Sequence, residues 1–179
     1  MKTLYFVSLM ILLLLVSGCG KGFSEGGYFA DGKAIAAEAK AGITEISHDV
    51  LRTQLEGGKL RVLIDVREPS EFEEGYINQA NDDFEFPYPE TFTVNIPRGI
   101  LEFKTGDVSY WDDELWIEMP SKDEAIVVYS QTGKRSALAT QALLQMGYNN
   151  VTSLKGGYRK WLDPNAPEEE ALKSSGGCG

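Results

Sequence analysis

The sequence Ile-Val-Val-Tyr-Ser-Gln-Thr-Gly-Lys-Arg-Ser-Ala, residues 126–137, decides the fold. Its first four residues are apolar and mostly β-branched, which is typical of a strand buried on both faces of a parallel sheet. The polar loop that follows leads into a helical pattern, so backbone N–H groups and the positive end of the helix dipole converge on one point. Gly133 permits a close approach of the backbone there. We therefore predict an anion-binding loop, formed by Ser130, Gln131, Thr132, Gly133, Lys134 and Arg135.

Further strand and helix patterns lie on both sides of this stretch. Apolar runs predict strands at residues 60–66, 93–96, 125–129 and 150–154, with a weaker one at 42–46. Helices are expected at residues 47–56, 69–74 and 134–146. Ser47 suits the cap of the first helix, Pro69 suits the first turn of the second, and Gly147 ends the third. This alternation predicts an α/β domain with a mainly parallel sheet of about five strands flanked by helices. Ligands of such sheets bind at the carboxyl ends of the strands.

The loop resembles that of the rhodanese-like domain family, whose active loop has the form Cys-x-x-Gly-x-Arg between a buried strand and a helix. Ser130 stands where the family has its cysteine. Other family-like motifs follow in the expected order. They are Leu63-Ile64-Asp65-Val66-Arg67 with Glu68, Phe72 and Gly75, then Asn95-Ile96-Pro97, and Leu154-Lys155-Gly156-Gly157-Tyr158 ahead of Trp161. The resemblance covers residues 43–162 and implies a single rhodanese-like domain, which we place at residues 43–163.

The resemblance also implies roles for residues outside the loop. Asp65 and Arg67 are expected to form a salt bridge at a strand end and so to help position the active loop. Gly156 and Gly157 are expected to be required by the path of the backbone rather than by a ligand. Neither a cofactor nor a metal ion is expected at this site.

The residue at position 130 determines which chemistry is available. Active members of the family use the loop cysteine as a thiolate that accepts sulfur from a donor such as thiosulfate and passes the resulting persulfide to an acceptor. A serine hydroxyl is far less acidic, and an oxygen nucleophile cannot form a sulfur–sulfur bond. The only histidine, His48, is expected in the first helix of the domain, so it cannot serve Ser130 as a general base.

Three functional hypotheses remain open. The first is a binding module for a small anion, such as sulfate, phosphate or a thiosulfate-like ion, or for a protein partner. The second is a sulfurtransferase-related protein that uses Cys178 or the thiol of a partner. The third is a structural scaffold without ligand or activity. The first is favoured, because the loop keeps its form while its nucleophile is absent.

The amino-terminal residues have the layout of a secretory signal. Lys2 precedes an apolar run from Leu4 to Val16, which is shorter than the roughly 20 residues of a membrane-spanning helix. Val16-Ser17-Gly18-Cys19 resembles the lipobox of bacterial lipoproteins, so residues 1–18 are expected to be a signal peptide and Cys19 the site of lipidation. An ordinary secretory signal is the alternative. The resemblance implies a protein held by lipid outside the cytoplasm, on the periplasmic side of a bacterial membrane.

Two segments flank the predicted domain. Residues 19–42 are expected to be a flexible tether that includes a short helix at residues 34–40, capped by Asp31. Residues 164–179 combine proline, consecutive glutamates and a Ser-Ser-Gly-Gly run, and they are expected to be disordered.

The charge and two unusual segments bear on partners. The formal net charge of −10 excludes nucleic acid as a favourable partner and disfavours binding to anionic lipid, so the membrane is expected to be reached through the lipid alone. Residues 78–92 and 107–118 are rich in acidic and aromatic side chains. They are expected to pack against the domain, and the alternative is a partner-binding surface.

Overall fold

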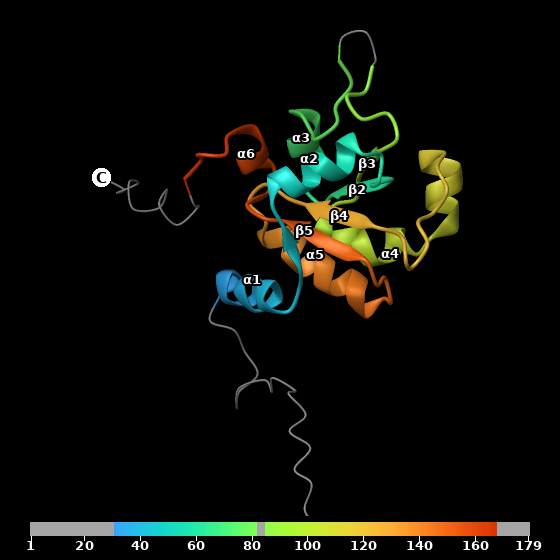
Figure 1. The fold of residues 1–179 in the computed structure, drawn as a ribbon. Coiled ribbons are helices and arrows are strands. Elements are labelled where there is room, and N and C mark those ends of the chain that lie inside the picture. The colour runs from blue at the N-terminus through green and yellow to red at the C-terminus, as the bar shows by residue number, and fades with distance from the viewer. Residues whose placement is uncertain (1–30, 82–84, 168–179) are drawn as a thin grey trace, which may run out of the picture.

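The sheet confirms the predicted α/β class. The computed structural model describes residues 31–81 and 85–167 (Figure 1). Five strands pair in parallel in the order β1-β5-β4-β2-β3. The strands are β1 (Glu45–Ile46), β2 (Val62–Asp65), β3 (Phe92–Asn95), β4 (Ile126–Tyr129) and β5 (Val151–Leu154). Every predicted strand is present: four have somewhat narrower bounds, and β3 begins and ends one residue earlier than predicted.

Helices cover both faces of the sheet (Figure 1). The α-helices are α1 (Gly32–Ala41), α2 (His48–Glu56), α3 (Pro69–Glu73), α4 (Leu101–Thr105), α5 (Lys134–Gln145) and α6 (Gly157–Leu162). A short 3₁₀ helix, η1 (Arg98–Ile100), and a π-helix, η2 (Tyr110–Leu115), complete the elements. Local signals set the helix ends as predicted, since the hydroxyl of Ser47 accepts a hydrogen bond from the N–H of Val50 and Gly147 has a φ of 87° just beyond α5.

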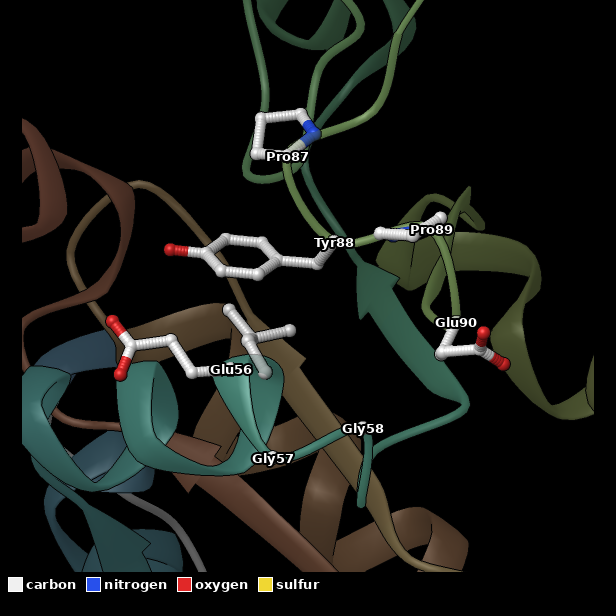
Figure 2. A pocket seen from close by; sticks show the side chains of 8 residues that line it. Glu56, Gly57, Gly58, Pro87, Tyr88, Pro89 and Glu90 are labelled. Carbon is white, nitrogen blue, oxygen red and sulfur yellow. The ribbon is translucent and has the colours of Figure 1, made fainter.

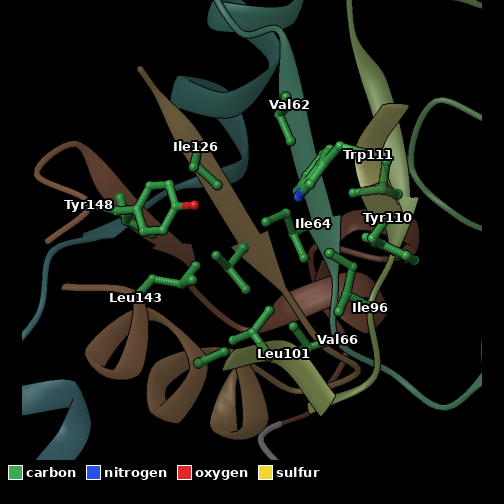
Figure 3. Packing of buried hydrophobic residues seen from close by; sticks show 14 residues of the cluster. Val62, Ile64, Val66, Ile96, Leu101, Tyr110, Trp111, Ile126, Leu143 and Tyr148 are labelled. Atoms are coloured by element: carbon green, nitrogen blue, oxygen red, sulfur yellow. The ribbon is translucent and has the colours of Figure 1, made fainter. Parts of the chain in front are cut away.

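Two apolar clusters fix the sheet between its helices. β2 and β4 are buried at all four of their positions, as expected of strands covered on both faces. One cluster joins the sheet to α4, α5 and η2 (Figure 3), with Val62, Ile64, Val66, Leu101, Trp111, Ile126, Val128 and Leu143 among its members. The other joins the opposite face to α2 and α6, with Leu51, Leu55, Leu63, Val127, Tyr129, Leu154 and Trp161.

The segment predicted as a flexible tether needs correction at residues 32–41. A helix was expected there and is present, but it packs against α5 instead of standing free of the domain. Ala36 and Ala39 are buried because their small side chains allow the two helices to approach closely. The boundary of the predicted tail also shifts, since residues 164–165 form a turn and Ala166 is buried. Residues 1–30 and 168–179, with the signal, Cys19 and Cys178, lie outside the described residues.

The aromatic segment at residues 107–118 packs mainly against the domain, as expected. Tyr110 and Trp111 are buried, and the indole N–H of Trp111 donates to the carbonyl oxygen of Thr105 at 3.1 Å. Trp116 departs from this pattern, because it is 85% exposed and has a left-handed backbone conformation. Within residues 31–81 and 85–167, no helix combines the length and the apolar character needed to span a bilayer.

Candidate functional site

Ser130 lies directly after β4, at the carboxyl edge of the sheet. It is only 1% exposed. Its Oγ accepts a hydrogen bond from the backbone N–H of Ser136 at 3.2 Å and lies 3.4 Å from the Ser136 hydroxyl. The Ser136 hydroxyl is in turn 2.9 Å from that of Ser153 on β5. A buried chain of three hydroxyl groups therefore ties the loop to α5 and to the neighbouring strand.

The shape of the loop depends on glycines that lie close to it. Gly133 has a φ of 82°, and a Cβ there would meet the backbone nitrogen of Gly156 at 3.1 Å. A Cβ on Gly157 would overlap the carbonyl oxygen of Ser130. The same carbonyl accepts a hydrogen bond from the N–H of Tyr158 at 2.9 Å, so the start of α6 is fastened to the loop. Gly157 is thus required by backbone packing, and Gly156 by its φ of 76°, as the family resemblance implied.

Asp65 and Arg67 form the expected salt bridge behind the loop. Both are almost fully buried, and Arg67 Nη2 lies 2.6 Å from Asp65 Oδ2. Arg67 also donates two hydrogen bonds to backbone carbonyl oxygens, from Nη1 to Glu71 at 2.9 Å and from Nη2 to Gly75 at 2.7 Å. Burial alone would lower the pKa of Arg67, but the hydrogen bonds and charge of Asp65 raise it above its ordinary value, so the guanidinium stays charged.

Arg67 also connects this salt bridge to the loop itself. Its Nη1 lies 3.4 Å from the side-chain oxygen of Gln131, and its guanidinium carbon lies 4.1 Å from the centre of the Tyr158 ring. Tyr129 forms the other aromatic neighbour, and its burial raises its pKa well above the ordinary value, so its hydroxyl remains protonated. Arg67 thus contacts both the loop and the start of α6, and the role of this pair in positioning the loop stays a prediction.

Arg135 has a carboxylate partner that sequence reasoning missed. Its two terminal nitrogens donate to the carboxylate of Glu71 on α3 at 2.6 and 2.7 Å. The hydrogen bond from Arg135 lowers the pKa of Glu71 below its ordinary value. An anion at the loop would have to compete with Glu71 for this guanidinium. Of the other predicted loop residues, Thr132 lies in the loop between β4 and α5, and Lys134 is the first residue of α5.

His48 takes no part in activating Ser130. Its Nε2 lies 3.3 Å from the carbonyl oxygen of Gly157, and its ring lies 6.5 Å from that of Trp161. Ser136 and Ser153, which were not predicted, form the hydroxyl chain of Ser130 instead. The one sequence signal for this chain of hydroxyl groups was a serine, Ser153, within the strand predicted at residues 150–154. No cluster of three potential metal ligands is found among residues 31–81 and 85–167.

These features define an α/β domain of five parallel strands, with a tight loop at the carboxyl end of the central strand braced by a buried Asp–Arg pair. The chain belongs to the rhodanese-like domain family, because the sequence model of that domain matches residues 47–164.

Known relatives agree with this assignment. The chain is 33% identical to human thiosulfate:glutathione sulfurtransferase over 125 residues, which are 69% of this chain and 96% of the human protein. It is also 32% identical to a putative mitochondrial thiosulfate sulfurtransferase of Schizosaccharomyces pombe. The match spans 109 residues, which are 60% of this chain and 67% of that protein. The solved structure of human single-domain sulfurtransferase TSTD1 matches with a TM-score of 0.56 and 29% identity, covering 68% of this chain and 97% of TSTD1.

Proposed function

We propose that this chain is a lipid-anchored, extracytoplasmic rhodanese-like domain that binds a small anion or a protein partner and transfers no sulfur through position 130. The observation that carries this proposal is the hydroxyl of Ser130, which stands at the end of β4 and accepts a hydrogen bond from the N–H of Ser136. Its position corresponds to that of the family's cysteine, according to the resemblance described above.

The chemistry of oxygen supports the loss of sulfur transfer. Formation of a persulfide requires a thiolate to attack the outer sulfur of thiosulfate, so that a new sulfur–sulfur bond forms and sulfite leaves with the electron pair of the old one. Ser130 offers no sulfur atom, and the side chain hydrogen-bonded to its hydroxyl is that of Ser136 rather than a base. A serine at this position can therefore hold a ligand but cannot carry sulfane sulfur.

The surroundings of Ser130 support an anion as one ligand. The loop leads into the 12-residue helix α5, whose positive dipole end points back at the loop. Lys134 and Arg135 add positive charge in the first turn of that helix. Sulfate, phosphate and thiosulfate are tetrahedral anions whose terminal oxygens can accept hydrogen bonds from such a loop.

The proposed anchor rests on the sequence around Cys19. The four residues from Val16 to Cys19 have the form of a lipobox. Helix α1 begins at Gly32, so about a dozen residues separate the proposed lipid from the folded domain. Such a linker would keep the domain close to the membrane surface.

A second candidate function is sulfur handling through another thiol. It is favoured by the names of relatives, which include a thiosulfate:glutathione sulfurtransferase and a putative thiosulfate sulfurtransferase. In this chain the thiol would come from Cys178 or from a partner protein. If the thiol is that of Cys178, its replacement by alanine would abolish the sulfur transfer.

Ser130→Cys provides the test. We expect the chain as it stands to show no sulfur transfer from thiosulfate to cyanide or glutathione, and Ser130→Cys to gain it, because the Ser136 N–H and the dipole of α5 would stabilise a thiolate. Ser130→Ala is the matched control and should stay inactive. Sulfur transfer by the unchanged chain would contradict the proposal. Loss of that sulfur transfer in Cys178→Ala would establish the second candidate function. A rise in melting temperature with sulfate should accompany the binding function.

A further inference from the structure

The first helix, α1, enters the domain at the same edge of the sheet as the Ser130 loop. α1 ends at Ala41, and only residues 42–44 separate it from β1. The carbonyl oxygen of Thr44 already accepts a hydrogen bond from the N–H of Ser153 on β5. Because β1 is parallel to its neighbour, its first residue lies at the amino edge of the sheet, and so does the end of α1. The start of α1 therefore points toward the carboxyl edge, where Ser130 follows β4.

The packing of α1 against α5 agrees with this direction. α5 follows β4 and so begins at the carboxyl edge, and α1 lies along it (Figure 1). Hydrogen bonds from the N–H groups of Ala34 and Lys33 lower the pKa of the Asp31 carboxyl group. The positive charge of Lys134, the first residue of α5, adds to this lowering, so the two helices start near each other. The 10 residues of α1 rise about 15 Å, close to the roughly 13 Å of a four-residue strand.

The linker between the proposed lipid and α1 is short compared with the domain. Cys19 and Asp31 are 12 positions apart, and a chain of that length spans at most about 40 Å even when it is fully extended. A domain of this size has a radius of gyration of about 14 Å and is therefore roughly 35 Å across. If the carboxyl edge pointed away from the bilayer, the linker would have to pass the whole domain and be almost fully extended. That requirement excludes most conformations of the linker and so costs entropy.

We propose that the carboxyl edge of the sheet faces the bilayer, so that the Ser130 loop takes its protein partner from the same membrane and is screened from soluble proteins. This inference rests on the lipid anchor of the proposed function and deepens it, because it states where the partner of the loop is held. A small anion reaches the loop through the gap between the domain and the bilayer. A soluble protein has to open that gap to its own width, which again requires an almost fully extended linker.

The amino edge of the sheet faces away from the bilayer in this orientation. A groove between the end of α2 and residues 87–90 lies there, at the amino ends of β2 and β3, and Gly58 lies beside Glu90 in its lining (Figure 2). Lys59 follows Gly58 and is exposed. Lys155 is its counterpart at the carboxyl edge, because it is also exposed and directly follows β5. The two lysines therefore offer matched positions for probes at opposite edges of the sheet.

Energy transfer to a labelled lipid tests the orientation. Lys155→Cys and Lys59→Cys are made separately in Cys178→Ala, so that the introduced thiol is the only free one once Cys19 carries its lipid. The acylated proteins are extracted from membranes, labelled with fluorescein and reconstituted on phosphatidylcholine vesicles that contain a rhodamine-labelled lipid. We expect energy transfer from position 155 to be at least about twofold more efficient than from position 59, because position 59 lies farther from the bilayer by much of the width of the domain.

Reaction with a bulky thiol reagent tests the screening of the carboxyl edge. For each unlabelled variant on vesicles, the rate with a polyethylene-glycol maleimide is divided by the rate with small N-ethylmaleimide, which corrects for the reactivity of each thiol. We expect this ratio to be at least about fivefold lower at position 155 than at position 59, because the bulky reagent has to force the domain away from the bilayer. In the same variants combined with Cys19→Ala, which carry no lipid, the two ratios should be equal.

The possible outcomes separate this inference from the proposed function. Equal or reversed energy transfer, or equal rate ratios at the two positions, in protein that floats with the vesicles would overturn the inference and leave the lipid anchor in place. Protein that does not float with the vesicles would refute the anchor and the inference together. Anion binding at Ser130 is measured separately, by the melting temperature with sulfate, and does not depend on either result. Circular dichroism confirms that each variant is folded.

Discussion

At the scale of single residues, Ser130 shows how tightly the loop is constrained. Its side chain is held by Ser136, and its carbonyl oxygen accepts the N–H of Tyr158. The same carbonyl leaves no room for a side chain on Gly157. A change at either serine alters a hydrogen bond, whereas a change at Gly157 displaces the backbone of the loop itself.

Gly157→Ala should therefore destabilise the domain. Its φ of 65° disfavours any residue with a Cβ, and the added methyl group overlaps the carbonyl oxygen of Ser130. We expect a loss of about 2 kcal/mol or more in the free energy of unfolding, measured by urea denaturation. Gly99→Ala is the control, because a Cβ there meets no atom within 4 Å. It should change stability by no more than about 0.5 kcal/mol. Equal effects of the two substitutions would contradict the packing argument.

At the scale of elements, the ion pair between Glu71 and Arg135 connects α3 to the first turn of α5. It joins residues 64 positions apart and occupies the guanidinium that an anion at the loop would use. The pKa of Glu71 is lowered by the hydrogen bond from Arg135. Such a carboxylate stabilises the fold above its unfolded-state pKa, and this contribution is lost as the pH falls through its lower folded-state pKa.

Glu71→Gln should therefore strengthen anion binding at neutral pH. Without this carboxylate, only the more distant Glu68, 3.8 Å from Arg135, competes with the anion, so the rise in melting temperature with sulfate should be larger than in the unchanged chain. In the unchanged chain, sulfate should produce this larger rise in melting temperature only at a pH below 4.5, the ordinary pKa of a glutamate, where Glu71 becomes protonated. Glu124→Gln, which removes the partner of Arg61 instead, is the control and should not alter the response to sulfate. An unchanged response in Glu71→Gln would show that Arg135 does not reach the anion.

At the scale of the whole molecule, the acidic charge and the proposed lipid act in opposite directions. The formal net charge of −10 repels anionic lipid head groups, so the folded domain has no electrostatic attraction to such a membrane. Attachment would then depend on the acyl chains at Cys19. Because α1 packs against α5, the segment between lipid and domain is shorter than the sequence suggested.

Cys19→Ala should release the protein from the membrane. Without acylation, and once residues 1–18 are removed, the acidic chain has no remaining affinity for the bilayer and should move to the soluble fraction after cell lysis. Cys178→Ala, which removes the other cysteine, should leave the distribution unchanged. Retention of Cys19→Ala in the membrane fraction after removal of residues 1–18 would refute the lipoprotein assignment.

The sequence by itself determined the class of the fold and the place of the loop. Hydrophobic runs, Ser47 as a cap, Pro69 in a first turn and Gly147 beyond α5 each act within a few residues along the chain. Such local signals predicted all five strands and the helices α1, α2, α3 and α5, but not the short helices α4 and α6. The pairing of Asp65 with Arg67 was also accessible, since the two residues are only two positions apart.

Only the tertiary structure decided which distant side chains meet. Several acidic residues could have partnered Arg135, and the path from α3 to α5 selects Glu71. The contact of Ser136 with Ser153 depends on how α5 crosses β5. The groove between α2 and residues 87–90 exists because Asn78 and Thr91 fix two separate loops beside each other. These contacts depend on packing between segments far apart in the chain, so local sequence patterns do not predict them.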